Sequence, residues 1–501
     1  MQTLFFNGKF YLGSGRWAAA VLAGVDGAIV DVSGNVLDPV LFANHGIRHH
    51  DFGGCFVFPA FEDAHNHPAA RARTRYELDF RAKDTAWDDV RNIMLGKAAV
   101  TPADQWIVCH GWSDARWPGV AAMELNSMFP DHGIMLVHIS YHGGIINKKG
   151  AALLAERGLA LSDIIMQHGG RITEQDFEEA LIMTSGSREQ YREAIPLALN
   201  ALVRKGIAAV HDMHVSTMEQ LEAYAELART KSLPIAAALY LNPRLLNESA
   251  QLRPHLQKNY NGLTIAGVKL FLDGAIGTST AAVSRPYRDG TGSGVLRMSY
   301  GECAAVIKKA GELGLGHVAM HCIGDRALDV AVDIFERLRD EYRRDITTWR
   351  FEHFEMPSER AIRALADRGG IASMQPNFNW DVAHYRARLG DDAERLNPFR
   401  AIQDAGATLA FGSDDMPSDP VAGIRWATIN APSLSQKLTL DEALDAYTSS
   451  PAKILGADRI RGKIAKGYEA NFVAFERNPF DASSDASACV PKEVWYRGMK
   501  I

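Results

Sequence analysis

The chain has 501 residues, of which 47% are hydrophobic and 23% are charged, and its formal net charge at pH 7 is −6. This composition is ordinary for a globular protein, and the length allows one large domain together with a smaller one. The mild negative charge and the lack of any Lys/Arg run argue against a surface that binds nucleic acid or an anionic membrane.

The cysteines and the N-terminal residues indicate in which cellular compartment the protein is expected. The cysteines are odd in number, scattered and without a Cys-x-x-Cys pair: Cys55, Cys109, Cys303, Cys322 and Cys489. This pattern is typical of reduced thiols rather than of a disulfide framework. The N-terminus lacks a basic start followed by a long apolar core, and no stretch is apolar for long enough to span a bilayer. We therefore expect a soluble, cytoplasmic protein without a signal peptide.

Short strand-like segments lie near both ends of the chain, separated by Gly and Asn turns. Five segments have this pattern: 3–6, 26–32, 48–52, 470–476 and 493–497. Neither terminal group is large enough to bury its own core. We therefore predict that residues 1–54 and 458–501 pair into one small β-sandwich domain.

From Cys55 onward, apolar strands alternate with helical segments such as 217–231 and 325–341. Eight strands are predicted: 55–61, 207–212, 235–240, 266–271, 317–322, 349–353, 371–375 and 408–413. Eight βα units predict an α/β fold, a (β/α)8 TIM barrel over residues 55–457. Residues 68–195 are too long for a βα loop, so we expect a structured lid or subdomain inserted after the first strand.

Metal-ligating residue types stand where active sites of such barrels lie, at the carboxyl ends of the strands. His65 and His67 follow the first strand with one residue between them, so both imidazoles can reach one ion. Four more candidates lie in or after later strands: Lys269, His321, His353 and Asp414. Taken singly, each has an ordinary explanation, such as an ion-paired lysine, a packed histidine or a helix cap. Their joint occurrence at strand ends is what indicates a metal centre.

These six side chains can hold two divalent ions if Lys269 is carboxylated by CO2, because an ammonium group has no lone pair to offer. Imidazole-rich sites with carboxylates suit Zn²⁺ best, with manganese, iron and cobalt as alternatives.

Short motifs run through nearly the whole chain, among them Phe58-Pro-Ala-Phe-Glu-Asp-Ala-His-Asn-His, Gly111-Trp-Ser-Asp, His138-Ile-Ser-Tyr-His, Asp273-Gly-Ala-Ile-Gly, Arg350-Phe-Glu-His and Gly412-Ser-Asp. Through them the chain resembles the metal-dependent amidohydrolase superfamily. It is most similar to the third amidohydrolase group, which includes N-substituted formamide deformylase and exoenzyme-regulator-like proteins.

The resemblance implies a ligand set and a reaction. His65 and His67 would bind the more buried ion together with Asp414. His321 and His353 would bind the second ion, and carboxylated Lys269 would bridge the two. The expected reaction is hydrolysis of a non-peptide carbon–nitrogen bond in a small amide-type substrate. A metal-bridging hydroxide would attack the carbonyl, and Asp414 would shuttle the proton to the leaving nitrogen.

Four further residues are candidates for contact with the substrate. His142, in the insertion, is predicted to act in catalysis by binding a substrate oxygen, and Trp112, Asn377 and Trp380 to line the pocket. The alternative is that His142 only structures the insertion and that the aromatic side chains only pack within it.

Two other functions are compatible with the barrel. A mononuclear-metal deaminase shares the His-x-His start but usually has Glu three residues after the strand-five histidine, where this chain has Gly324. A non-catalytic regulatory or binding relative would be expected to have lost a ligand, whereas all six candidates are present. Barrels of this type often form oligomers, so a homo-oligomer such as a dimer remains open.

Overall fold

The computed structural model describes residues 1–34, 46–81, 84–139, 141, 143–161, 169–256, 260–485 and 489–501. His142, a predicted site residue, lies outside the described residues. The chain divides into two compact units: residues 1–68, 196–215 and 224–501 form the first, and residues 69–195 with 216–223 form the second. In the described part of the chain, no helix is both long enough and apolar enough to cross a membrane.

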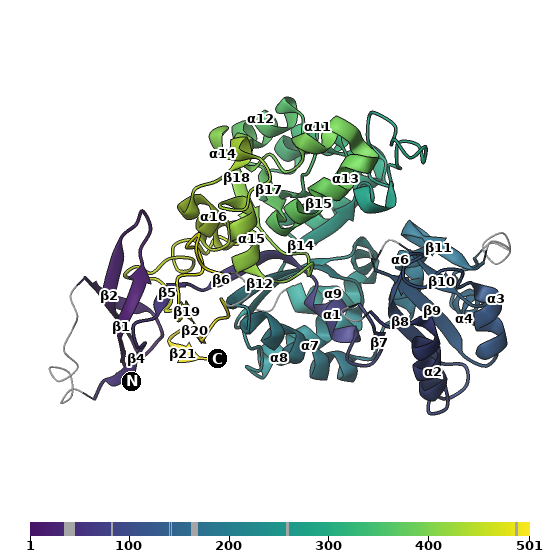
Figure 1. Cartoon of the computed structure of the whole chain (residues 1–501), viewed down its shortest axis with the longest axis horizontal. Coiled ribbons are helices and arrows are strands. Elements are labelled where there is room, and N and C mark those ends of the chain that lie inside the picture. The colour runs from purple at the N-terminus through teal and green to yellow at the C-terminus, as the bar shows by residue number, and fades with distance from the viewer. Residues whose placement is uncertain are drawn as a thin grey trace. The chain divides into compact units, whose positions relative to one another are not determined.

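The first unit contains an eight-stranded parallel sheet that curves into a nearly closed barrel (Figure 1). Its strands follow one another in chain order: β6 (Phe61–Asn66), β12 (Ile207–Val215), β13 (Ala236–Leu241), β14 (Leu263–Phe271), β15 (His317–Cys322), β16 (Thr348–His353), β17 (Ile371–Met374) and β18 (Thr408–Phe411). The first and last strands meet near their carboxyl ends, where the Ser413 and Asp414 amides, just after β18, donate to the carbonyl of His65 in β6 at 3.1 and 2.7 Å. The predicted TIM barrel is confirmed.

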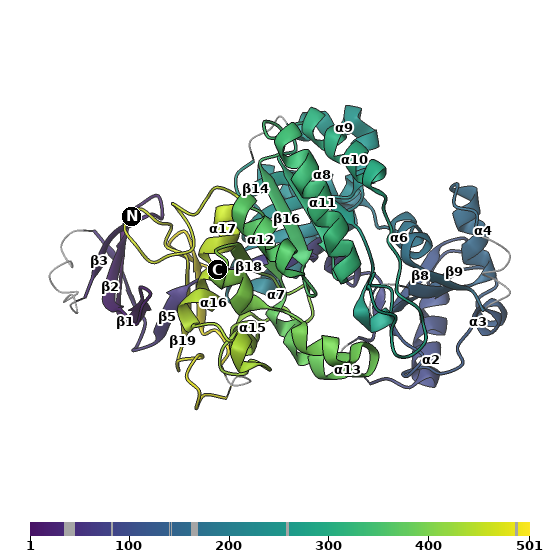
Figure 2. The ribbon, with the colours of Figure 1, turned by 90° about the horizontal axis from the view of Figure 1, so that it is seen from above.

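Helices connect the barrel strands and cover the outside of the sheet (Figure 2). They are α7 (Arg188–Val203), α8 (Met218–Arg229), α9 (Ser249–Leu256), α10 (Tyr300–Glu312), α11 (Asp325–Glu341), α12 (Glu359–Arg368), α13 (Val382–Leu389), α14 (Phe399–Asp404), α15 (Pro420–Ala427), α16 (Leu440–Ala446) and α17 (Ser449–Ile454). Among the described residues, short 3₁₀ helices also lie between them: η2 (Pro243–Glu248), η3 (Ile276–Thr278), η4 (Pro376–Trp380), η5 (Gly390–Arg395) and η6 (Leu434–Gln436).

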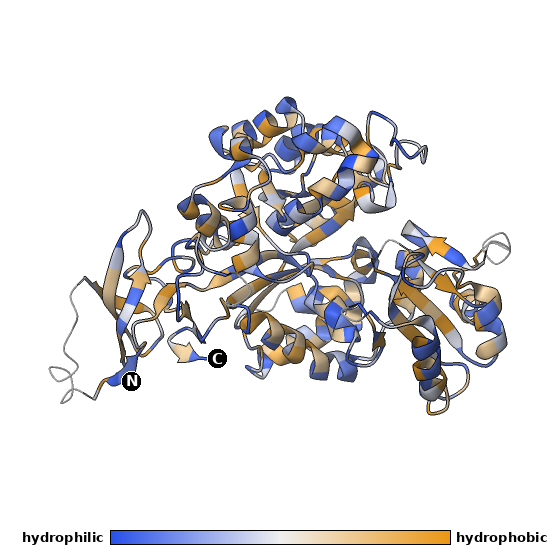
Figure 3. Cartoon of the chain, in the orientation of Figure 1, coloured by the Kyte–Doolittle hydropathy of each residue, from blue (hydrophilic) through white to orange (hydrophobic). Residues whose placement is uncertain are grey.

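The sequence of these elements explains where they form. α11 buries Leu328, Ala331, Phe335 and Leu338, an i, i+3, i+7, i+10 spacing that places one apolar stripe against the sheet. The hydropathy colouring of Figure 3 shows the same alternation of apolar and polar stretches along the helices. By contrast, β15 is buried at every position from Val318 to Cys322, as expected for a parallel strand covered on both faces.

The predicted bounds of the first barrel strand, 55–61, are wrong. Residues Phe56–Pro59 form β5, which pairs with β1 (Thr3–Tyr11) and with β19 (Phe472–Phe475) in a different sheet. Only Ala60 separates β5 from β6, the true first strand of the barrel. The apolar run over residues 55–61 crosses the junction between the two sheets, while β6 itself is mostly polar in sequence (Phe-Glu-Asp-Ala-His-Asn), so the local pattern does not show where the barrel strand lies. As a result, His65 lies within the barrel strand and not after it.

The second sheet of the first unit joins the two ends of the chain. Its strand order is β21-β20-β19-β5-β1-β2-β3, with β4 paired to β1. The elements not yet given are β2 (Trp17–Ala23), β3 (Ile29–Ser33), β4 (Arg48–Asp51), β20 (Glu493–Tyr496) and β21 (Met499–Lys500). Phe5 lies at its centre, with ring centroids 5.2 Å from Phe472 and 4.8 Å from Trp495. Aromatic burial between residues from opposite ends of the sequence stabilises this sheet.

The second unit has a five-stranded sheet in the order β11-β10-β9-β8-β7. The strands are β7 (Leu78–Asp79), β8 (Trp106–Trp112), β9 (Gly133–His138), β10 (Gly143–Ile146) and β11 (Arg171–Thr173). The helices are α1 (Pro68–Arg73), α2 (Trp87–Ala98), α3 (Ala122–Met128), α4 (Lys148–Glu156) and α6 (Glu174–Met183). Asn147 caps α4 by accepting from the Gly150 amide at 2.8 Å, and it also accepts from the Ile134 amide at 2.8 Å.

Candidate metal centre

The six predicted ligands lie at or near the carboxyl ends of the barrel strands. His65 is in β6 and His67 follows it directly, while Asp414 lies three residues after β18. The other three belong to adjacent strands: Lys269 to β14, His321 to β15 and His353 to the end of β16.

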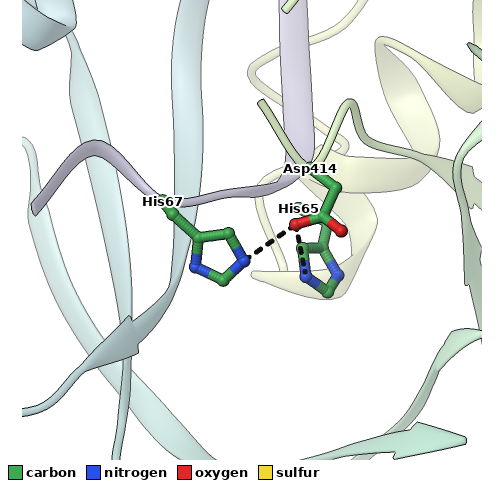
Figure 4. Close-up of side chains that lie close together, drawn as sticks. All are labelled: His65, His67 and Asp414. Carbon is green, nitrogen blue, oxygen red and sulfur yellow. Dashed lines mark ion pairs between the residues drawn. The ribbon is translucent and has the colours of Figure 1, made fainter. Parts of the chain in front are cut away.

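His65, His67 and Asp414 form a compact cluster (Figure 4). Asp414 Oδ1 lies 2.9 Å from His67 Nε2 and 3.7 Å from His65 Nε2. One possible ligand atom from each of the three lies within 4.8 Å of the others. Two imidazoles and a carboxylate around one point are a donor set that suits Zn²⁺ and leaves coordination positions open.

The remaining candidates continue this cluster along neighbouring strands. The His353 ring centroid lies 4.8 Å from that of His65 and 4.4 Å from that of His321. Lys269 is buried and interacts electrostatically with His65, His353 and Asp414. The structure therefore brings all six predicted residues together at one end of the barrel.

Hydrogen bonds on the outer ring nitrogens fix how the imidazoles face this point. His65 Nδ1 lies 2.7 Å from Glu352 Oε2, and His353 Nδ1 lies 2.8 Å from Gln375 Oε1. Because both partners are acceptors, Nδ1 carries the proton in each ring and Nε2 keeps its lone pair. Metal-binding histidines are held in this way by carboxylate or carbonyl oxygens. The orientation of these two rings thus fits a divalent cation.

Strained backbone occurs at the same place. After β16, His353 and Phe354 have φ of 71° and 49°, and after β18, Asp414 and Asp415 have φ of 54° and 57°. Residues with side chains seldom adopt this left-handed region, which costs on the order of 1–3 kcal/mol per residue. Such strain clusters at functional sites, and here it affects two of the six candidate ligands.

The charge states of the cluster favour cation binding. Burial opposes ionisation of Asp414, but the hydrogen bond from His67 and nearby positive charge lower its pKa to about 2. Burial lowers the pKa of His65 and of His353 well below the ordinary value, and nearby positive charge acts in the same direction. Burial also lowers the pKa of Lys269, to about 8. At neutral pH the cluster therefore contains a carboxylate and the neutral imidazoles of His65 and His353, the forms that ligate metals. The pKa of His67 moves the other way: burial lowers it, but the hydrogen bond to the Asp414 carboxylate and its charge raise it above the ordinary value.

A family model described as "Amidohydrolase family" matches residues 49–499, which is most of the chain. The chain belongs to the amidohydrolase family.

Relatives within this family cover nearly the whole chain. "Putative amidohydrolase YtcJ" of Bacillus subtilis (strain 168) is 26% identical over 460 residues, 85% of this chain and 85% of the relative. N-substituted formamide deformylase of Arthrobacter pascens is 25% identical over 474 residues, 87% of this chain and 86% of the relative. The crystal structure of an uncharacterized metal-dependent hydrolase from Pyrococcus horikoshii OT3 superposes with a TM-score of 0.79 at 26% identity, covering 96% of this chain and 98% of that one.

Asp63 and Asn377 hold the loop that carries Asp414. The sequence predicted no role for Asp63 and a substrate contact for Asn377. Asp63 accepts hydrogen bonds from the Ser413 amide (3.0 Å), the Ser413 hydroxyl (2.6 Å) and the His65 amide (3.1 Å). Asn377, predicted to contact substrate, donates to the Ser413 carbonyl (2.9 Å) and to the Met416 carbonyl (2.6 Å). These two hydrogen bonds of Asn377 thus fix the backbone on either side of Asp414.

The other predicted substrate contacts lie in different environments. Trp380, in η4, is 60% exposed, and its ring centroid lies 5.2 Å from that of His384. Trp112 belongs to the second unit and is buried in its core, with the His138 ring at 5.2 Å and the Arg171 guanidinium over its face at 5.0 Å. Packing alone accounts for the burial of Trp112.

Glu352 and Gln375 were missed by the sequence analysis. Both are polar residues at the end of a barrel strand or directly after it, in the motifs Arg350-Phe-Glu-His and Ser373-Met-Gln-Pro. Buried polar residues of this kind need partners, which is the signal that marks them. Which histidine each one contacts depends on strand order, so it follows only from the fold.

Proposed function

We propose that this chain is a metal-dependent hydrolase that cleaves a non-peptide carbon–nitrogen bond in a small amide. The observation that carries the proposal is the cluster of His65, His67 and Asp414, whose ligand atoms lie within 4.8 Å of one another at the barrel's carboxyl end. Family membership and the superposition on a metal-dependent hydrolase support it.

His65, His67 and Asp414 would hold one divalent ion, and His321 with His353 a second. Lys269, once carboxylated by CO2, would supply the anionic link between them, and its burial among these residues supports that role. Zn²⁺ suits this imidazole-rich set best. When bound, two such cations lower the pKa of a water molecule and polarise the substrate carbonyl.

Asp414 is the proton carrier in this proposal. Its low pKa keeps it deprotonated at neutral pH, so it can accept the proton that the attacking water loses. It then donates this proton to the nitrogen of the breaking bond, which allows the amine to leave. The hydrogen bonds of Asp63 and Asn377 to the adjacent Ser413 hold the Asp414 carboxylate in place for both transfers.

The deaminase alternative finds no support in the geometry. A deaminase of this type would usually have a glutamate at position 324, but a Cβ atom on Gly324 would lie 2.1 Å from the Ala282 carbonyl oxygen. The next residue, Asp325, accepts a hydrogen bond from the Ser284 amide at 2.8 Å at the start of α11.

The test is hydrolysis of a panel of N-alkyl- and N-arylformamides, longer N-acyl amines and cyclic amides, with amine release as the readout. The formamides are included because one relative is an N-substituted formamide deformylase. Asp414→Asn should retain the fold and lose turnover by about three orders of magnitude or more, in keeping with loss of general acid–base catalysis.

The matched control is Asp391→Asn, which makes the same change at an exposed position in η5. This variant should turn over substrate within about twofold of the unaltered protein, since surface substitutions away from special features are near neutral. Near-normal turnover by Asp414→Asn would refute its assignment as the proton carrier.

A further inference from the structure

A chain of buried polar side chains runs through the barrel interior to His65. Apart from His65 itself, the proposed reaction uses none of its members. In order, it consists of Arg461, Glu62, His211, Arg350, Glu352 and His65. Glu62, His211, Arg350 and Glu352 are all at most 3% exposed. Buried charged groups of this kind are costly unless each is paired, so the chain calls for an explanation.

The inner half of the chain joins Arg350 to the metal centre. Arg350 Nε lies 2.7 Å from Glu352 Oε1, and Arg350 Nη2 donates to Glu352 Oε2 at 3.2 Å. Glu352 Oε2 in turn lies 2.7 Å from His65 Nδ1. The guanidinium therefore faces both carboxylate oxygens, which fixes the plane of the carboxylate that His65 contacts.

The outer half supplies a hydrogen-bond acceptor to the buried guanidinium on its other side. Arg350 Nη1 lies 2.8 Å from His211 Nδ1, and His211 Nε2 lies 3.0 Å from Glu62 Oε1. Glu62 Oε1 also accepts from Arg461 Nη2 at 3.3 Å. Acids and bases alternate along the chain except where His211 meets Arg350, and there a hydrogen bond joins the two bases. No charge within the chain is therefore left without an opposite neighbour or a hydrogen bond.

Arg350 is held rigidly by further contacts from three other strands. Its Nη2 atom donates to the Ala64 carbonyl at 2.6 Å and to the Ser373 hydroxyl at 3.0 Å. The face of the Tyr240 ring covers the guanidinium, with its centroid 4.7 Å away. Because these partners come from β6, β13 and β17, Arg350 cannot shift without disturbing several strands.

The chemistry of the chain fixes the proton on each imidazole. Arg350 can only donate, so His211 must accept at Nδ1 and carry its own proton on Nε2, which it donates to Glu62. The Glu352 carboxylate can only accept, so His65 must carry its proton on Nδ1. The His65 Nε2 lone pair then faces the side on which His67 and Asp414 lie, with Asp414 Oδ1 3.7 Å away.

We propose that Arg350 and Glu352 are positioning residues, which hold His65 in the tautomer and orientation that bind the first metal ion. Glu352 balances the charge that Arg350 brings into the barrel, and His211, held by Glu62, accepts the hydrogen bond of its Nη1 atom. The inference rests on the proposed metal-dependent function and deepens it. It assigns the metal affinity of the site in part to residues that themselves touch no metal.

The test replaces Glu352 by glutamine, which has nearly the same shape but no charge. Its amide group can donate to His65 Nδ1, so the ring can take the wrong tautomer, with its proton on Nε2. The matched control is Glu442→Gln. Glu442 forms an ion pair with Arg400 in the same unit, and its side chain contacts Arg400 and Thr439 rather than an imidazole. Full-length variants are stripped of metal, checked by circular dichroism, and titrated with Zn²⁺ against a chromophoric chelator.

Glu352→Gln should raise the dissociation constant for Zn²⁺ by about 10- to 100-fold, the usual effect of losing an outer partner of a ligating histidine. It should also change the visible absorption of the Co²⁺-substituted protein, which a merely structural change elsewhere does not alter. Glu442→Gln should match the unaltered protein in both. A Glu352→Gln protein with unchanged affinity and an unchanged Co²⁺ spectrum would overturn the inference.

If Glu352→Gln does not fold, Glu352→Asp replaces it, because its carboxylate keeps the charge but is one methylene shorter. It should bind Zn²⁺ at least about threefold more weakly, and unchanged affinity would again overturn the inference. Metal binding by the unaltered protein distinguishes failure of the proposed function from failure of this inference. If it binds no Zn²⁺ or Co²⁺, the proposed function fails and this inference with it; if it binds and the Glu352 variants bind equally, only this inference fails.

Discussion

Replacing Gly412 with alanine would force apart the two strands that close the barrel beside the metal centre. A Cβ atom at this position would lie 2.3 Å from the His65 backbone nitrogen, 2.6 Å from the His65 Cβ and 2.8 Å from its Cα. The atoms it meets are mostly backbone, so no rotamer change relieves the overlap. We expect the substitution to destabilise the protein by about 3 kcal/mol, the upper end of the usual range for overpacking.

The same displacement should weaken metal binding. The Ser413 and Asp414 amides donate to the His65 carbonyl directly after Gly412, so moving this segment separates Asp414 from His65 and His67. The assay is the thermal unfolding midpoint of metal-free protein, followed by Zn²⁺ titration of whatever folds. Gly412→Ala should lower the midpoint by several degrees and weaken Zn²⁺ binding.

The control is Gly301→Ala in α10, where an added Cβ atom meets nothing within 4 Å. Alanine is the better helix former, so this variant should be as stable as the unaltered protein or up to about 1 kcal/mol more stable. If Gly412→Ala unfolds at the same temperature as Gly301→Ala and binds Zn²⁺ normally, the close approach of β18 to His65 is refuted.

Two further predictions concern stability away from the metal centre. Burial opposes ionisation of Glu77, but Arg73 and His110 lower its pKa from 4.5 to about 2. Its contribution is therefore complete above pH 4.5 and is lost as the pH falls toward 2, on the order of 3 kcal/mol, so Glu77→Gln should flatten urea-unfolding stability across this window. Ser299→Ala removes the capping box with Glu302 at the start of α10 and should cost about 1 kcal/mol, and an unchanged thermal midpoint would contradict it.

That the candidate ligands lie close together could be predicted from the sequence, because parallel strands bring their carboxyl ends to one edge. His321 and His353 close two apolar strands, and that position alone places them at the same end of a barrel. Their separation of 4.4 Å between ring centroids follows from β15 and β16 being neighbours in the sheet. Residue type and strand order were therefore sufficient to predict that these two rings lie close together.

Strand membership near the N-terminus could not be predicted in the same way. The apolar run ends near Phe61, and most of Phe61–Asn66 is polar in sequence although it is a buried barrel strand. Only long-range pairing with β19 assigns Phe56–Pro59 to another sheet. The strand Trp17–Ala23 went unpredicted, because its alanine-rich sequence carries little β-propensity. Its place is set by pairing with β1 and β3, which no local pattern reveals.

The hydrogen-bond partners of the candidate ligands could not be predicted from the sequence either. Glu352 and His65 are 287 positions apart, so their hydrogen bond depends on the closed order of eight strands. The roles of Asp63 and Asn377 likewise depend on where the loop after β18 returns to β6 and η4.

The central claim, a metal centre built from His65, His67 and Asp414 with three further residues, is tested most directly by metal content. Protein purified without chelators, and supplied with Zn²⁺ and bicarbonate, would be measured by plasma mass spectrometry. The account predicts about two divalent ions per chain, falling sharply in a His65→Ala, His67→Ala double variant. A chain that holds no divalent ion after this treatment would contradict it.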